Sequence, residues 1–170
     1  MTLRSTSLWL WLGLATLIAI LDQITKRIVV RVLEYGQEVV VWPMFSWVRL
    51  HNEGAAFSLF SEASGWQRWF FVLVAVGFTI FLVYELRRLQ PGQWLYGLAF
   101  GLILGGAWGN LYDRLLEGYV VDFILVHYQR QYFFPAFNLA DAAITVGAML
   151  WIGLMVREAW QERRASASAD

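Results

Sequence analysis

The chain has 170 residues, of which 59% are hydrophobic and 15% are charged, and its formal net charge is +0. A soluble domain of this length has too small an interior for about one hundred apolar side chains, so the composition indicates a lipid bilayer as solvent. Zero net charge without a lysine or arginine cluster argues against a nucleic-acid partner. The chain has no cysteine, and only His51 and His127 as histidines, so we expect no disulfide, no thiolate nucleophile and no metal site.

Four apolar segments predict membrane-spanning helices, because each approaches the roughly 20 residues that cross a bilayer. They are residues 8–25, 69–84, 94–112 and 139–156. To reach full span length, the first and fourth segments must include Asp22 and Asp141, which places both carboxylates within the membrane. A carboxylate at the bilayer centre costs about 2.5 to 3.5 kcal/mol of insertion free energy. We therefore expect both acids to be paired, water-facing or functional.

The first apolar segment follows Arg4, as in a secretory signal, but no small-residue cleavage site comes after it. This pattern favours a retained helix. The short connection at residues 85–92 contains Arg87 and Arg88, which predicts a cytoplasmic location for it. Four spans then place both termini in the cytoplasm, and residues 28–68 and 113–137 on the opposite, non-cytoplasmic side.

The non-cytoplasmic segments carry the remaining structure. Residues 39–42 and 45–50 flank Pro43 and predict two short strands. The aromatic side chains expected to rest on the lipid headgroups are Trp42, Trp47, Phe57 and Phe60. The predicted fold is an all-α membrane protein with four transmembrane helices, a small periplasmic β-sheet and a periplasmic helix or loop, forming one integral membrane domain over residues 1–170.

Two acidic residues suggest an enzyme. Asp122 lies in the apolar sequence Val-Val-Asp-Phe-Ile, which raises the pKa of a carboxyl group, although a strand or turn residue that reaches water would also fit. Asp141 meets it if the intervening segment folds back. Two carboxylates about 4 Å apart repel by roughly 4 kcal/mol at an effective dielectric near 20, so one proton serves both, as in aspartic proteases.

Asp141 also has a structural explanation. Asn138 fits the N-cap of the last helix, and an acid three residues later commonly bonds back to the cap. Capping alone would account for both residues. The helix dipole at this position favours an ionised carboxylate as well, so capping and a role as catalytic base are compatible.

Other polar residues allow two interpretations each. Asn110 shares a helix face with Asp113 and Arg114, which indicates either a polar helix end or groups that bind a substrate backbone. Asp22 and Lys26 have the spacing of a helical ion pair near the membrane interface.

Asn52 and a row of glycines in the third apolar segment also have structural explanations. Asn52, within His-Asn-Glu-Gly, suits a turn or a substrate contact. Gly101, Gly105 and Gly109 recur every fourth residue, with Gly106 beside them, and predict close helix packing.

Taken in order, the segments LDQITK, HNEGAAFSLF, GGAWGNLYDRLLEGYVVDFI and FPAFNLADAAITVG resemble those of the bacterial lipoprotein signal peptidases, signal peptidase II. The resemblance implies an aspartic endopeptidase of the bacterial inner membrane that cuts prolipoproteins just before a diacylglyceryl-modified cysteine, with Asp122 and Asp141 as the catalytic pair at the periplasmic side. It implies no metal or organic cofactor.

The resemblance also assigns roles to other residues. It implies that four polar residues bind substrate or globomycin-type inhibitors, namely Asn52, Asn110, Arg114 and Asn138. Asp22, Lys26 and Asp113 are expected to be structural. Two other functions use similar residues: a proton-coupled small membrane transporter, which needs carboxylates near the bilayer midplane, and a scaffold that binds helices through the glycine face.

Overall fold

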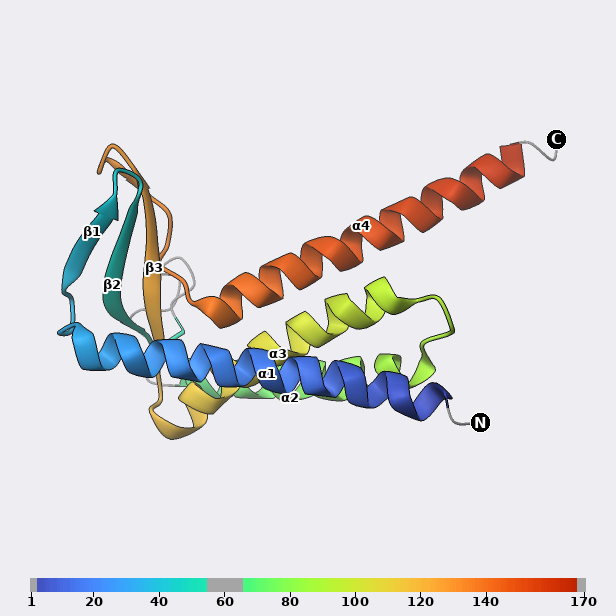
Figure 1. Cartoon of the computed structure of the whole chain (residues 1–170), viewed down its shortest axis with the longest axis horizontal. Helices are drawn as coiled ribbons and strands as arrows, with labels where there is room; N and C mark the ends of the chain where they lie inside the picture. The colour runs from blue at the N-terminus through green and yellow to red at the C-terminus, as the bar shows by residue number, and fades with distance from the viewer. Residues whose placement is uncertain (1–2, 55–65, 168–170) are drawn as a thin grey trace.

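The computed structural model describes residues 3–54 and 66–167, with the backbone alone for residues 3–7. Four long helices form a bundle, and a sheet stands at one end of it, where α1 ends and α4 begins (Figure 1). The helices are α1 Leu3–Val32, α2 Trp66–Arg88, α3 Trp94–Leu116 and α4 Leu139–Ala167. Both chain ends lie toward the opposite end of the bundle.

Three of these helices, within the described residues, are long and apolar enough to cross a membrane. They are Leu8–Val32, Trp66–Arg88 and Leu139–Ala167, with mean hydropathies of 1.6, 2.2 and 1.9. The chain is therefore a multi-pass membrane protein. The 23-residue α3 packs against the other three helices and has the longest row of buried residues.

Glycines bring α3 close to its neighbours. A methyl group added at Gly105 would lie 2.7 Å from the carbonyl oxygen of Ala15 on α1, and one added at Gly106 would collide with the carbonyl oxygen of Ala140 on α4. The close packing predicted from the glycine repeat is confirmed. It also brings the polar residues of α1 and α4 to the same end of α3.

The buried residues of α4 lie near its start. They are Ala140, Ala143 and Gly147, all in the first third of the described helix. Further along, Trp151 packs against the rings of Phe100 on α3 and Phe81 on α2, so α4 stays in contact with the bundle beyond its buried part.

The sheet is antiparallel, with the order β1-β2-β3-β4. Its strands are β1 Glu38–Trp42, β2 Phe45–Asn52, β3 Val120–Tyr128 and β4 Tyr132–Phe133. The first two confirm the strands predicted around Pro43. Residues 113–137, expected to form a helix or loop, instead extend the same sheet, because β3 pairs with β2 and places Leu50 opposite Asp122. Trp42 and Trp47 are exposed, whereas Phe57 and Phe60 lie outside the described residues.

Candidate active site

Asp122 lies on β3 in a buried environment, with 3% of its surface exposed. Its Oδ2 accepts a hydrogen bond of 3.0 Å from Asn52 Nδ2, and its Oδ1 accepts one of 2.8 Å from Asn138 Nδ2. Burial, together with the negative charge of Asp141, raises the pKa of Asp122 from 3.8 to about 7. The carboxyl group is therefore poised to hold a proton at neutral pH.

Asp141 lies in the first turn of α4 and caps it. Its backbone N–H donates to Asn138 Oδ1 at 2.9 Å, and its Oδ2 accepts from the Asn138 backbone N–H at 3.2 Å. This reciprocal pair confirms the predicted capping. Asn110 Nδ2 on α3 donates to the other oxygen at 2.7 Å. Both oxygens of Asp141 therefore accept N–H bonds at the N-terminus of α4.

Asn138 connects the two acids. Its side chain is fully buried and contacts Asp122 through its amide nitrogen and the Asp141 backbone through its amide oxygen. One asparagine thus fixes both carboxyl groups, one on the sheet and one on α4. Their surroundings differ, which is the arrangement that separates an acid from a base.

A buried lysine supports this site from the bundle side. Lys26 Nζ on α1 lies 2.6 Å from Asp22 Oδ2 and 2.6 Å from Asp113 Oδ2, and it donates to Asn110 Oδ1 at 2.9 Å. Asp22 Oδ1 also accepts from the backbone N–H of Ala140 at 2.9 Å, which ties α1 to the start of α4. Because the ammonium occupies the carbonyl side of Asn110, the amide nitrogen of Asn110 is free to face Asp141.

The Asp22–Lys26 pair has the i,i+4 ion-pair geometry that its spacing predicts. Both side chains are buried in the protein, at 0% and 2% exposed. A second acid, Asp113 on α3, also forms an ion pair with Lys26. Sequence spacing detects a pair on one helix, whereas a partner on another helix depends on packing.

Gln23 is a polar residue of this network to which the sequence analysis assigned no role. Its Nε2 donates to Asp113 Oδ1 at 2.7 Å and to the Gly109 carbonyl at 3.2 Å. A signal was present in the sequence: Gln23 is a polar residue inside an apolar span, one position from Asp22.

Arg114 lies beside the acids and gains a second contact that the sequence did not reveal. Its Nη1 lies 3.4 Å from the carbonyl oxygen of Asn110, and its guanidinium packs over the ring of Phe71 on α2, 4.8 Å from the ring centroid. Among the described residues, its buried Nε has no hydrogen-bond partner.

Asn52 ends β2 and shapes the turn that follows. Its Oδ1 accepts from the Gly54 N–H at 2.9 Å, and Gly54 has a φ of +109°, a conformation that favours glycine. The turn predicted at Asn52 is therefore present, and the amide nitrogen of the same side chain contacts Asp122.

All nine site residues predicted from the sequence lie in one connected network. They are Asp22, Lys26, Asn52, Asn110, Asp113, Arg114, Asp122, Asn138 and Asp141. In the described part of the chain, no three histidine, aspartate or glutamate side chains are placed to hold a metal ion. The groups available for chemistry are thus the carboxyls, the amides and one guanidinium.

A cavity opens beside the acids. Its volume is about 630 Å³, and its walls include Asn52, Phe71, Arg114, Pro135, Phe137, Asp141, Thr145 and Val146. A second cavity of about 310 Å³ shares Phe71, Arg114 and Asp141 and continues between α2, α3 and α4. A third, of about 430 Å³, reaches Phe81 and Trp151. Together they form an apolar groove that leads from the acids along the helices.

Residues 14–157 match the family model described as Signal peptidase (SPase) II. The chain belongs to the signal peptidase II family. It is 52% identical over 141 residues to the lipoprotein signal peptidase of Pseudomonas paraeruginosa, covering 82% of this chain and 83% of the relative. It is 49% identical to that of Teredinibacter turnerae over 142 residues, covering 84% of each chain.

A solved structure described as a bacterial membrane enzyme, obtained by the in meso method at 2.3 Å resolution, superposes on this chain with a TM-score of 0.76. The two are 31% identical, and the match covers 88% of each chain. As a member of the signal peptidase II family, this chain is an aspartic endopeptidase that removes signal peptides. Family membership favours the peptidase over the transporter and the scaffold.

Proposed function

We propose that Asp122 and Asp141 are the catalytic pair, and that the substrate is a prolipoprotein whose cysteine carries a diacylglyceryl group, cleaved just before that cysteine. The observation that carries this proposal is the linkage of two carboxyl groups through Asn138: the buried Asp122, and the half-buried Asp141, which lines a cavity. Asp141 accepts N–H bonds on both oxygens, and burial raises the pKa of Asp122 to about 7.

The surroundings of each carboxyl group indicate its role in the reaction. Asp141 accepts N–H bonds on both oxygens at a helix start, so it is the base that takes a proton from the attacking water. Asp122 starts protonated and donates its proton to the oxygen of the scissile carbonyl. When the tetrahedral intermediate collapses, the proton on Asp141 passes to the leaving amine, and a hydroxyl proton returns to Asp122. One water is consumed and one peptide bond is broken.

The groove between α2 and α4 fits the signal peptide. Its walls are apolar side chains from Phe71 to Trp151, and it opens sideways between two helices that are long enough to span the bilayer. A hydrophobic signal helix enters it laterally without leaving the lipid. Arg114 and Asn52, at the wall of the larger cavity, bind the extended backbone on either side of the scissile bond. Globomycin-type inhibitors occupy the same cavity.

We further propose that the chain is one integral domain, residues 1–170, of the bacterial inner membrane, with α3 as a fourth span. The 23 residues of α3 extend about 35 Å at 1.5 Å per residue, which is enough to cross the hydrocarbon layer. Arg87 and Arg88 end α2 far from the sheet (Figure 1), which supports cytoplasmic termini and an active site with its sheet at the periplasmic side.

The proposal is tested by cleavage of a diacylglyceryl-modified prolipoprotein by the purified protein in lipid bilayers. Asp122→Asn and Asp141→Asn should each lower kcat by about 10²-fold or more, because each removes a proton-transfer group. Glu117→Gln, which alters an exposed acid at the end of α3, should leave the rate unchanged. Cleavage at the normal rate by either Asn variant would refute the assignment. A substrate without the lipid group should be cut poorly if the lipid is recognised.

A further inference from the structure

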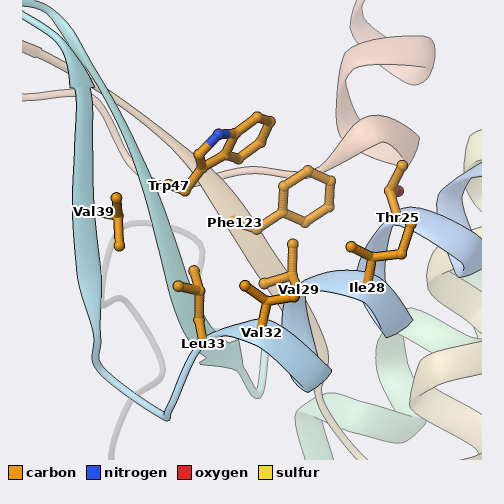
Figure 2. A pocket seen from close by; sticks show the side chains of 8 residues that line it. All are labelled: Thr25, Ile28, Val29, Val32, Leu33, Val39, Trp47 and Phe123. Atoms are coloured by element: carbon orange, nitrogen blue, oxygen red, sulfur yellow. The ribbon is translucent and has the colours of Figure 1, made fainter.

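A separate apolar pocket of about 310 Å³ lies between the end of α1 and the sheet (Figure 2). Four α1 residues between positions 25 and 32, with Leu33 just after the helix, form one wall, and Val39, Trp47 and Phe123 from three strands form the other. The signal peptidase reaction described above makes no use of this pocket.

The lining of the pocket is suited to hydrocarbon. Among the α1 residues that line it, only Thr25 has a polar side chain, and its hydroxyl is already bonded to the carbonyl oxygens of Leu21 and Asp22 on its own helix. The opposite wall presents the Val39 side chain and the rings of Trp47 and Phe123. With no free polar group on the helix side, water gains few hydrogen bonds there, and an apolar ligand is favoured.

The pocket continues the lipid-facing surface of α1. Exposed apolar side chains follow one face of that helix with helical spacing and end in the pocket wall; they are Leu17, Leu21, Ile24, Ile28 and Val32, each between 41% and 71% exposed. From Leu17 to Val32 this row rises about 22 Å, more than the roughly 15 Å of hydrocarbon in one leaflet. An acyl chain lying along the row therefore has a continuous apolar path to the pocket.

The strand geometry separates the pocket from the catalytic pair. Successive side chains of a strand point to opposite faces, so Asp122 faces the site while Phe123 lines the pocket. On α1, Lys26 faces α3 whereas Thr25 and Val29 line the pocket. This separation points to a bilayer lipid and away from the lipid of the substrate, which is tethered to the cysteine at the cleavage site.

A cation lies at the same end of α1. Arg49 Nη1 on β2 donates to the carbonyl oxygens of Val30 and Leu33, at 3.3 and 3.2 Å, and Leu33 lines the pocket. A guanidinium at this level complements the phosphate of a phospholipid whose chain enters the pocket.

We propose that this pocket binds one acyl chain of a bilayer phospholipid, which lies between α1 and the sheet and holds the sheet against the membrane surface. Val39→Trp should fill the pocket. Val40→Trp is the matched control, because it places the same side chain at the next position of β1, outside the pocket lining.

The test uses the full-length protein in bilayers that contain phosphatidylglycerol with a photoreactive diazirine on its acyl chain, followed by mass spectrometry of labelled peptides. Labelling of residues 25–33 should fall about tenfold in Val39→Trp, since loss of a few buried methylene groups is enough for that change, and should persist in Val40→Trp. Ile28→Trp fills the pocket from the other wall and should give the same loss, so the test does not depend on one variant folding.

Three results would overturn the proposal. One is equal labelling of residues 25–33 in the wild type and in both pocket variants. Another is labelling spread evenly over all lipid-facing helices, which would indicate ordinary bilayer contact. The third is preferential labelling of residues 25–33 by a prolipoprotein that carries the diazirine on its own diacylglyceryl group, which would assign the pocket to the substrate.

Discussion

Replacing Asp122 with asparagine should abolish cleavage and yet stabilise the folded protein at pH 8. Burial and the charge of Asp141 raise the pKa of Asp122 from 3.8 to about 7. At about 1.4 kcal/mol per pH unit, ionised Asp122 costs the folded state about 4 kcal/mol once the pH is above 7. An uncharged asparagine removes this cost.

The substitution also loses a hydrogen bond. Both oxygens of Asp122 accept N–H groups, from Asn52 and Asn138, whereas the asparagine amide presents only one oxygen. The N–H group left without an acceptor lowers the free energy of unfolding of the variant by about 1 to 3 kcal/mol. The expected net gain at pH 8 is therefore about 1 to 3 kcal/mol.

The sign of the effect depends on pH. A carboxyl group with a raised pKa destabilises the folded state increasingly as the pH rises from 3.8 to about 7. The advantage of the asparagine variant should thus shrink below pH 7, and near pH 4 the variant should be the less stable protein, because only the lost hydrogen bond remains.

The assay is denaturant-induced or thermal unfolding of wild type and Asp122→Asn, in the same detergent, between pH 4 and pH 8. Asp113→Asn is the matched control: it removes an acid paired with Lys26 at 2.6 Å and should be destabilised at every pH in this range. A stability difference between wild type and Asp122→Asn that does not change with pH would refute the reasoning.

Three further predictions concern activity and packing. The cleavage rate should fall as the pH rises through about 7, since Asp122 must hold a proton; a flat rate from pH 6 to 9 would contradict this. Lys26→Met should lower the free energy of unfolding by about 3 to 5 kcal/mol, measured by denaturation, because it leaves two buried carboxylates unpaired. Gly106→Ala should cost about 1 to 3 kcal/mol, whereas Gly153→Ala, which meets no atom within 4 Å, should be neutral; equal stability of the two would be inconsistent with close packing at Gly106.

Features set by local spacing were predictable from the sequence. The Asn138–Asp141 capping pair, the glycine face of α3 and the hairpin around Pro43 each depend on residues within a few positions of one another. Their periodicity reflects the geometry of a single helix or turn, so no knowledge of the rest of the fold was needed.

Features set by packing between distant segments were not predictable. The pairing of β3 with β2 and the contact of Asp113 with Lys26 join residues at least 68 positions apart. Burial of the Asp22–Lys26 pair follows from the close approach of α1 to α3, which i,i+4 spacing does not report. The convergence of Asp122 and Asp141 was expected only on the condition that the chain folds back between them, and the sheet supplies that return.

The contact pattern of α4 has a mechanical consequence. Its buried residues lie in its first third, where Asp22 and Asn138 also bond to it, and Trp151 packs against Phe100 and Phe81 further along. Contacts at two levels resist tilting of the helix about its start. We therefore expect Asp141 to keep its position when a signal peptide enters beside α2.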